Sequence, residues 1–147
     1  MKQIQIIVGS VLGASEYVAE AVAEKLQGLG FTTELHLQPE FDQIKQQDIW
    51  LICSSTHGAG DLPDNIQDFA DSLQDQQLEG LPYAVISLGD SSYDTFCEGG
   101  STLHRLMHKA NAKPLCEPFE IDVLQHPIPE DIAVEWLEKN SSLFAQV

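Results

Sequence analysis

The chain has 147 residues, a length that suits one domain with a single hydrophobic core, and we expect one domain over residues 1–147. Its 23 acidic residues outnumber 7 basic ones and give a formal net charge of −16, which disfavours nucleic acid and favours a protein partner with a basic patch. No apolar run approaches the length of a membrane span and no signal-peptide pattern occurs, so we expect a cytoplasmic protein without membrane contact.

The first predicted unit, residues 4–29, is a strand, a turn and a helix. An apolar run begins at Ile4 and is long enough for a strand, and apolar residues recur at helical spacing from Val18 to Leu29. A strand that leads through a tight turn into a helix points several backbone N–H groups at one place, where the helix dipole favours an anion. The turn is therefore a candidate phosphate site; its sequence is Gly9-Ser10-Val11-Leu12-Gly13-Ala14-Ser15-Glu16.

The candidate phosphate turn differs from two common nucleotide-binding patterns. It lacks Gly-x-Gly-x-x-Gly, and it lacks the Gly-Lys-Ser/Thr ending that serves nucleoside triphosphates. No lysine or arginine lies between Lys2 and Lys25, so neutral hydroxyls and amides would have to hold the anion. An ordinary tight turn, with Ser15 as the N-cap of the helix, explains this stretch equally well.

The remaining sequence alternates between strand and helix patterns. The run at 49–53 is apolar almost throughout, which predicts a central strand, whereas 31–37 is predicted at a sheet edge. Residues 40–47 are expected to be a polar connection, and Asp64 is placed to cap the next helix. The other strands are predicted over 83–88 and over 113–123, the latter split or kinked by Pro114 and Pro118, and helices are predicted over 66–78, around 103–110 and after Pro129.

This alternation predicts an α/β fold, with a parallel sheet covered by helices on both faces. In such sheets, ligands bind beyond the carboxyl ends of the strands, where the strand order reverses. The loops after the first, third and fourth strands would meet there, and all are rich in glycine and serine. A flat aromatic ring attached to a phosphate would suit them, because Tyr93 can stack on the ring and backbone amides can bond its polar edge.

These loops resemble those of the flavodoxin family. Gly9-Ser10, Gly13 and Ser15-Glu16-Tyr17 are similar to the family's phosphate loop, Ser55-Thr56-His57-Gly58 to its second loop, and Gly89-Asp90-Ser91-Ser92-Tyr93 with Phe96-Cys97 to its third. The similarity extends along the whole chain, and the run Ser-Thr-His-Gly-Ala-Gly-Asp-Leu-Pro-Asp-Asn is most similar to the short-chain MioC-type flavodoxins. The resemblance implies a three-layer, doubly wound sheet of five parallel strands in the order 2-1-3-4-5.

The resemblance also implies an electron carrier, not a catalyst, that binds FMN non-covalently and moves single electrons. An NADPH-dependent flavin reductase would be the donor and an enzyme such as biotin synthase the acceptor. Because full reduction adds negative charge to a domain already at −16, we expect a low potential for the second electron. Acidic residues near the ring, for example Asp61, Asp64, Asp90, Asp94 and Glu98, would steer basic patches of both partners.

Roles in FMN binding follow from the same resemblance. Ser10 and Ser15 would give hydroxyls to the phosphate, Tyr93 would cover the outer face of the ring, and the carbonyl of Gly58 would turn toward the flavin N5 proton. Thr56 would support the ribityl chain or the phosphate, and the backbone around Asp90 and Cys97 would bond the pyrimidine edge. No catalytic residue and no metal ligand is expected. The full set of cofactor contacts is Ser10, Val11, Leu12, Gly13, Ala14, Ser15, Ser55, Thr56, His57, Gly58, Gly89, Asp90, Tyr93, Phe96 and Cys97.

Departures from the family pattern keep a second interpretation open. Leu12 and Ala14 stand where many flavodoxins have a hydroxyl and a polar side chain, and each lost neutral hydrogen bond would cost about 0.5–1.5 kcal/mol. His57 replaces an aromatic residue that often shields the inner face, and an imidazole can take up a proton near neutral pH. The alternative is a flavodoxin-like interaction module that has lost FMN.

Other interpretations have less support in the sequence. A signalling receiver domain shares this strand order, but it needs paired acids after the first strand and an aspartate after the third, where Gly9-Ser10 and Ser54-Ser55 stand here. A quinone- or azo-reducing enzyme would need a further substrate pocket that no motif supplies. Acidity that merely keeps the protein soluble also explains the charge.

The cysteines and two histidines are not expected to form a metal site or a disulfide framework. Cys53, Cys97 and Cys116 are widely spaced without a Cys-x-x-Cys pair, so we expect reduced thiols and no zinc or iron–sulfur site. His104 and His108 have the i, i+4 spacing of paired zinc ligands but no third ligand beside them, and we expect a surface pair.

Overall fold

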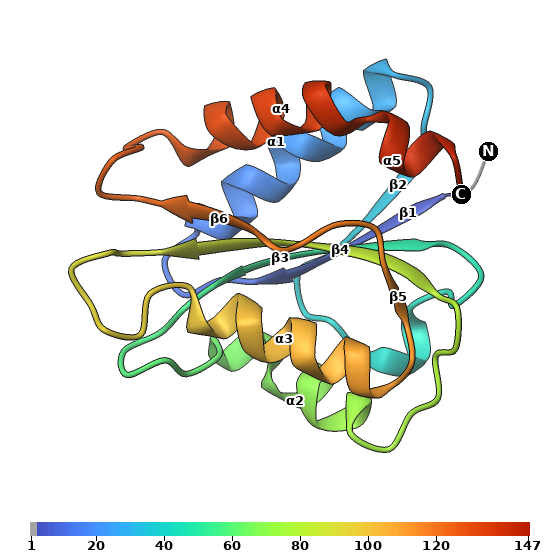
Figure 1. Ribbon diagram of the computed structural model, residues 1–147, viewed down its shortest axis with the longest axis horizontal. Coiled ribbons are helices and arrows are strands. Elements are labelled where there is room, and N and C mark those ends of the chain that lie inside the picture. Colours follow the sequence, from blue (N-terminus) through green and yellow to red (C-terminus); the bar gives the residue numbers. More distant parts are fainter. Residues whose placement is uncertain (1–2) are drawn as a thin grey trace.

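Strands and helices alternate along the chain in the computed structural model, which describes residues 3–147 (Figure 1). The strands are β1 (Ile4–Gly9), β2 (Thr33–His36), β3 (Ile49–Ser55), β4 (Pro82–Gly89), β5 (Lys113–Pro114) and β6 (Phe119–Asp122). The helices are α1 (Ala14–Gly28), α2 (Asp64–Leu73), α3 (Glu98–Lys109), α4 (Pro129–Asn140) and α5 (Ser142–Ala145), with a 3₁₀ turn at Phe41–Gln43. Within the described residues no helix is both long and apolar enough to cross a membrane.

All the strand pairs are parallel, and their order is β2-β1-β3-β4-β5. The predicted order 2-1-3-4-5 is therefore confirmed, with β3 in the centre and β2 at an edge. The fifth strand is split as predicted: β5 pairs with the start of β4, where Lys113 lies opposite Pro82, and β6 pairs with its end, where Phe119 lies opposite Ile86. Pro114 and Pro118 interrupt it because proline has no N–H to give to the ladder.

Helices cover both faces of the sheet, as the apolar strands require. In Figure 1, α1, α4 and α5 lie on one face, and α2 and α3 lie on the other. Side chains alternate along β1: Ile6 is buried in the cluster beneath α1 and α4, and Ile7 in the cluster above α2 and α3. Trp50 and Ile52 of β3 belong to the second cluster and Leu51 to the first. Burial on both faces explains why β3 has no polar alternation.

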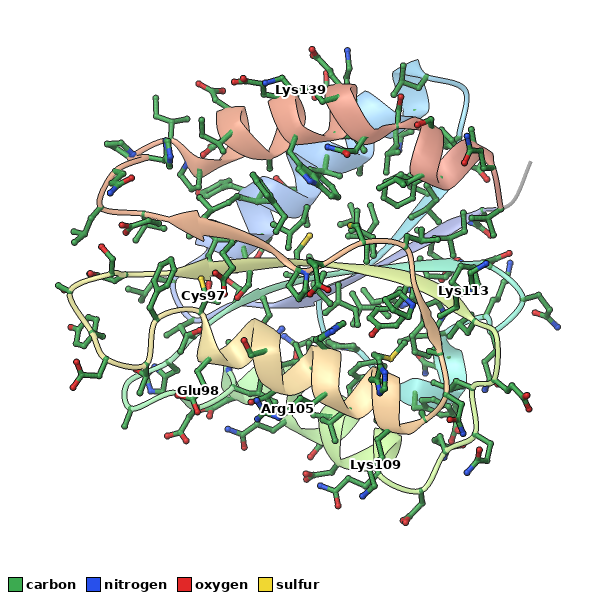
Figure 2. All side chains as sticks on the ribbon, viewed as in Figure 1. Cys97, Glu98, Arg105, Lys109, Lys113 and Lys139 are labelled. Atoms are coloured by element: carbon green, nitrogen blue, oxygen red, sulfur yellow. The ribbon has the colours of Figure 1, made fainter. Side chains whose placement is uncertain are left out.

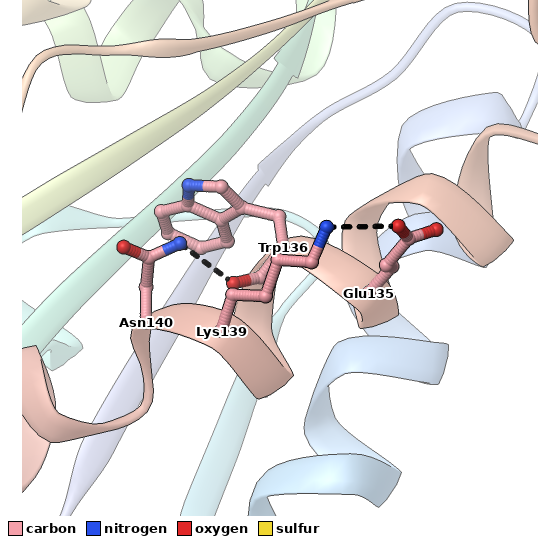
Figure 3. Close-up of polar contacts among 4 residues, drawn as sticks. All are labelled: Glu135, Trp136, Lys139 and Asn140. Carbon is pink, nitrogen blue, oxygen red and sulfur yellow. Dashed lines mark hydrogen bonds and ion pairs between the residues drawn. The ribbon is translucent and has the colours of Figure 1, made fainter.

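Side-chain contacts stabilise the last turns of α4 (Figure 3). Lys139 forms an ion pair with Glu135 at 3.1 Å, and the Asn140 side chain donates to the carbonyl of Trp136 at 2.8 Å. The indole of Trp136 stacks on Phe119 of β6, with 5.2 Å between ring centroids. Trp136 thus packs α4 against β6.

Some predicted helix ends are wrong. Gly13, in the left-handed region at φ 92°, is the N-cap of α1, and Ser15 is the second helical residue. Pro63 precedes α2, so Asp64 is its first residue and makes no capping hydrogen bond. Helix α2 ends at Leu73. Leu78 is buried in the core outside the helix, and its amide donates to the carbonyl of Ala110 at 2.7 Å.

Residues 40–47 were predicted to be a polar connection, but two of their side chains belong to the hydrophobic core. They contain the 3₁₀ turn, and Phe41 and Ile44 are both buried in the cluster above α2 and α3. The ring of Phe41 meets Trp50 edge-on, with 6.0 Å between centroids. This segment therefore closes one end of the core.

Candidate functional site

The predicted loops after β1, β3 and β4 converge at the carboxyl edge of the sheet and line one cavity of about 240 Å³. A neighbouring hollow of about 180 Å³ lies between the second and third loops. The first cavity is lined by Val11, Leu12, Ala14, Ser55, Thr56, His57, Leu88, Gly89, Asp90 and Val123, and the second by Thr56, Gly58, Asp90, Tyr93, Thr95 and Phe96. The structure thus brings together residues far apart in the sequence that were predicted to share one site.

The first loop presents free backbone donors at the start of α1. Amides in the first turn of a helix have no acceptor within the helix, and here they belong to Ala14, Ser15 and Glu16. The loop is closed by the amide of Gly13, which donates to Oγ of Ser10 at 2.9 Å. Ser15 is fully buried, and its hydroxyl shares a hydrogen bond with that of Ser55 at the end of β3. Hydroxyls and positively polarised amides therefore meet at one point.

The apolar members of the first loop are exposed. Leu12 is 92% exposed and Val11 45% exposed, although both border the cavity. Neither side chain has a polar atom to offer an anion. The loop's capacity to bind phosphate therefore rests on its amides and on the Ser10 hydroxyl.

The second loop is a tight turn between His57 and Asp61. These two residues exchange two backbone hydrogen bonds, of 2.7 and 2.8 Å, and the turn between them places Gly58 at φ 51° and Gly60 at φ 96°. The Thr56 hydroxyl accepts a hydrogen bond from the amide of Gly99 at 2.9 Å, which ties this loop to the first turn of α3. The side chain of His57 is exposed and lies between two cavities.

The third loop keeps its shape through its own side chains. Oδ1 of Asp90 accepts from the amide and the hydroxyl of Ser92, at 2.8 and 2.6 Å. The Tyr93 ring is 60% exposed, as a stacking platform requires, and Phe96 is half-buried beside the second hollow. The carboxylate of Asp122, at the end of β6, accepts from the amide of Ser91 at 3.2 Å.

The third loop ends in a close approach between Gly89 and Cys97. A Cβ on Gly89 would lie 2.6 Å from the amide nitrogen of Cys97, so only glycine fits. Cys97, at φ 55°, is the N-cap of α3, and its buried thiol donates to the carbonyl of Ser87. Burial raises the pKa of the Cys97 thiol to about 11 and that of Cys53 to about 12, so neither is a nucleophile near neutral pH.

The structure also shows residues that the sequence interpretation missed. Asn65 binds the first loop, Asp122 binds the third, Thr95 donates weakly to the carbonyl of Gly58 at 3.4 Å, and Val123 lines the cavity. Asn65 and Asp122 both lie in sequence stretches that resemble the family, but no role was attached to them. The available signal was a polar residue near the end of a predicted strand, as Asp122 is in 113–123, or directly before a predicted helix, as Asn65 is before 66–78.

The structure corrects the prediction that His104 and His108 form a surface pair. His104 is half-buried, and its Nδ1 shares a hydrogen bond with the Tyr83 hydroxyl at 2.9 Å, so only His108 of the predicted pair is exposed. Burial lowers the pKa of His104 and raises that of Tyr83 to about 12. No group of three or more histidine, cysteine or acidic side chains placed to hold a metal occurs among residues 3–147.

Charge is distributed unevenly between the two ends of the sheet. The site loops contain no lysine or arginine but include Asp61, Asp90 and Asp94. Figure 2 shows Cys97 and Glu98 at the end of the molecule where these loops gather, and Lys113 at the opposite end. A positively charged surface would therefore be attracted to these loops.

Comparison with known proteins gives a consistent result. The family model described as "Flavodoxin" matches residues 6–136 of the chain. Protein MioC of Escherichia coli strain K12 is 45% identical over 139 residues, which cover 93% of this chain and 95% of MioC. The sulfite reductase [NADPH] flavoprotein alpha-component of Shewanella sp. strain ANA-3 is 36% identical over 125 residues, which cover 82% of this chain and 21% of that protein.

A solved structure agrees over the same length. A cysteine-to-alanine mutant of flavodoxin from Pseudomonas aeruginosa superposes with a TM-score of 0.90 at 32% sequence identity, covering 97% of this chain and 99% of the other. The agreement extends over all the layers described above.

Proposed function

This chain belongs to the flavodoxin family, whose members carry electrons on FMN, and we propose that it moves single electrons from a flavin reductase to an acceptor enzyme. It is an electron carrier and not a catalyst. The observation that supports the proposal best is one cavity lined by all three predicted loops, with free amides at one side and an exposed tyrosine beside it.

The residues at the start of α1 fit the FMN phosphate. The amides of Ala14, Ser15 and Glu16 are the donors, and the Ser10 hydroxyl lies in the same turn, whereas the Ser15 hydroxyl is buried against that of Ser55. The described loops place no cationic side chain there, so binding depends on these neutral groups and the helix dipole. Anions are bound at helix N-termini by this chemistry.

The rest of the cavity fits the flavin ring. Leu88 and Val123 give apolar walls, and Tyr93 is free to stack on the outer face. Backbone groups near Asp90 and Cys97 are available for the polar edge, and the carbonyl of Gly58 lies at the turn where a peptide can rotate cheaply, because glycine tolerates both signs of φ. Bound FMN supplies the redox chemistry; these residues bind it, orient it and limit its contact with water.

Charge governs both the potential and the partner. A domain with a formal charge of −16 resists a second added electron, which favours transfer in single steps at low potential. The acidic, lysine-free loops favour partners with a basic patch beside their own redox centre. The likeness to a sulfite reductase flavoprotein component supports an NADPH-dependent flavoprotein as donor, and the resemblance to MioC-type flavodoxins makes biotin synthase the acceptor to test first.

A titration tests the proposal. FMN added to purified apoprotein is expected to lose its fluorescence and to raise the melting temperature of the protein. Reduction of the complex is expected to proceed in two one-electron steps with separate potentials. Electron transfer from the reductase is expected to slow as ionic strength rises. A protein that leaves FMN fluorescence and its own melting temperature unchanged would instead be the interaction module that Leu12 and Ala14 suggest. Electron-transfer rates that do not depend on salt would refute charge steering of the partner but not FMN binding.

A further inference from the structure

Asn65 links the phosphate loop to two strands and a helix, and we propose that it is a positioning residue that holds this loop in its binding shape before FMN arrives. The inference deepens the proposed function, because it concerns how the same phosphate site is built. Asn65 is the second residue of α2 and is half-buried. None of its atoms needs to touch FMN for this role.

The Asn65 side chain makes three hydrogen bonds to the backbone, two as a donor and one as an acceptor. Its Nδ2 donates to the carbonyl of Val8 at 2.7 Å and to the carbonyl of Leu37 at 2.9 Å. Its Oδ1 accepts from the amide of Ser10 at 2.9 Å. One side chain therefore joins the end of β1, the residue after β2 and the first residue of the phosphate loop. No other standard side chain of this length offers two donors and an acceptor in one plane.

The restraint continues from Ser10 to the start of α1. With its backbone fixed by Asn65, Ser10 accepts the amide hydrogen of Gly13 on its Oγ. Gly13 is the N-cap of α1 and sets the direction of the amides that follow. Two hydrogen bonds in series thus hold the loop between two helices. The α2 end is firm, because Ile66 and Phe69 are fully buried.

A consequence distinguishes this role from ordinary structural support. The Ser10 amide is already committed to Asn65, so the phosphate must rely on amides further along the loop and on the Ser10 hydroxyl hydrogen. A loop held in shape in advance loses less conformational entropy on binding. Loss of Asn65 should therefore weaken the part of binding that depends on the phosphate and leave the ring site intact.

The Asn65→Ala variant tests this by comparing FMN with riboflavin, which has the same ring and no phosphate. Asn65 borders an open polar cavity of about 410 Å³, so water can reach the backbone groups that the variant frees, and we expect it to fold. Its FMN affinity is expected to fall about tenfold or more, with riboflavin affinity within about twofold of the wild type. The control, Asn140→Ala, removes an asparagine–backbone bond on α4 (Figure 3) and should change neither.

The outcomes separate this inference from the proposed function. Equal losses for FMN and riboflavin, or no loss for FMN, would overturn the positioning role while wild-type binding stands. A wild type that binds no FMN would remove the proposed function itself. If Asn65→Ala does not fold, amide hydrogen exchange of the wild-type apoprotein decides: protection at Ser10 is expected, and exchange as fast as in an unstructured peptide refutes the proposal.

Discussion

Leu12 offers a test by gain of affinity. Its side chain is 92% exposed at the rim of the cavity, at the position where many flavodoxins have a hydroxyl. Leu12→Thr would place a hydroxyl beside the amides of α1 without removing any buried apolar contact. One new neutral hydrogen bond contributes about 0.5–1.5 kcal/mol, so FMN binding is expected to tighten about 2- to 12-fold.

Fluorescence titration of FMN at fixed pH and ionic strength measures this change, and Leu12→Ala is the matched control. The alanine variant loses the same apolar side chain but adds no hydroxyl, so it should bind FMN like the wild type. Riboflavin affinity and the free energy of unfolding of the apoprotein should be unchanged in both variants, because Leu12 packs against almost nothing. A threonine variant that binds FMN no tighter than the alanine variant would refute our placement of the phosphate.

Two further predictions concern the third loop. Gly89→Ala is expected to lower the free energy of unfolding, measured in urea, by about 1–3 kcal/mol, because its Cβ would lie 2.6 Å from the Cys97 amide nitrogen. In the control, Gly28→Ala, the new Cβ would have no atom within 4 Å, so the free energy of unfolding should not fall. Equal losses in the two variants would contradict the packing argument. Hydrogen bonding by Ser91 holds the pKa of Asp122 below its usual value of 3.8, so its stabilisation is present above that pH and is lost as the pH falls through the folded-state pKa. The stability difference between wild type and Asp122→Asn should therefore shrink below about pH 4, and a difference that stays constant from pH 7 to pH 2 would count against this role.

The sheet could be predicted because its signals are local. Apolar runs marked β1, β3 and β4, and two prolines marked the split of the fifth strand. The helix ends could not be predicted as well, because competing contacts decide them. Ser15 has the chemistry of an N-cap, but its hydroxyl pairs with Ser55, and the left-handed backbone of Gly13 begins the helix.

The sequence predicted which loops would meet, but not the residues that support those loops. The loop motifs are contiguous, so their spacing alone indicated convergence at one edge. The bonds of Asn65 reach Leu37, Val8 and Ser10, which lie 28, 57 and 55 residues away in the sequence. His104 was misplaced for the same reason, since its partner Tyr83 lies on a different element. Such pairings depend on how the elements pack, which periodicity does not encode.

The broken fifth strand has a consequence for self-association. The sheet ends on one side in β2, which is only four residues long, and on the other in two fragments separated by a detour. A long, flat, unpaired border would be a template on which strands of neighbouring molecules could add. Here each border is short or interrupted, so we expect little tendency for the sheets of neighbouring molecules to join edge to edge.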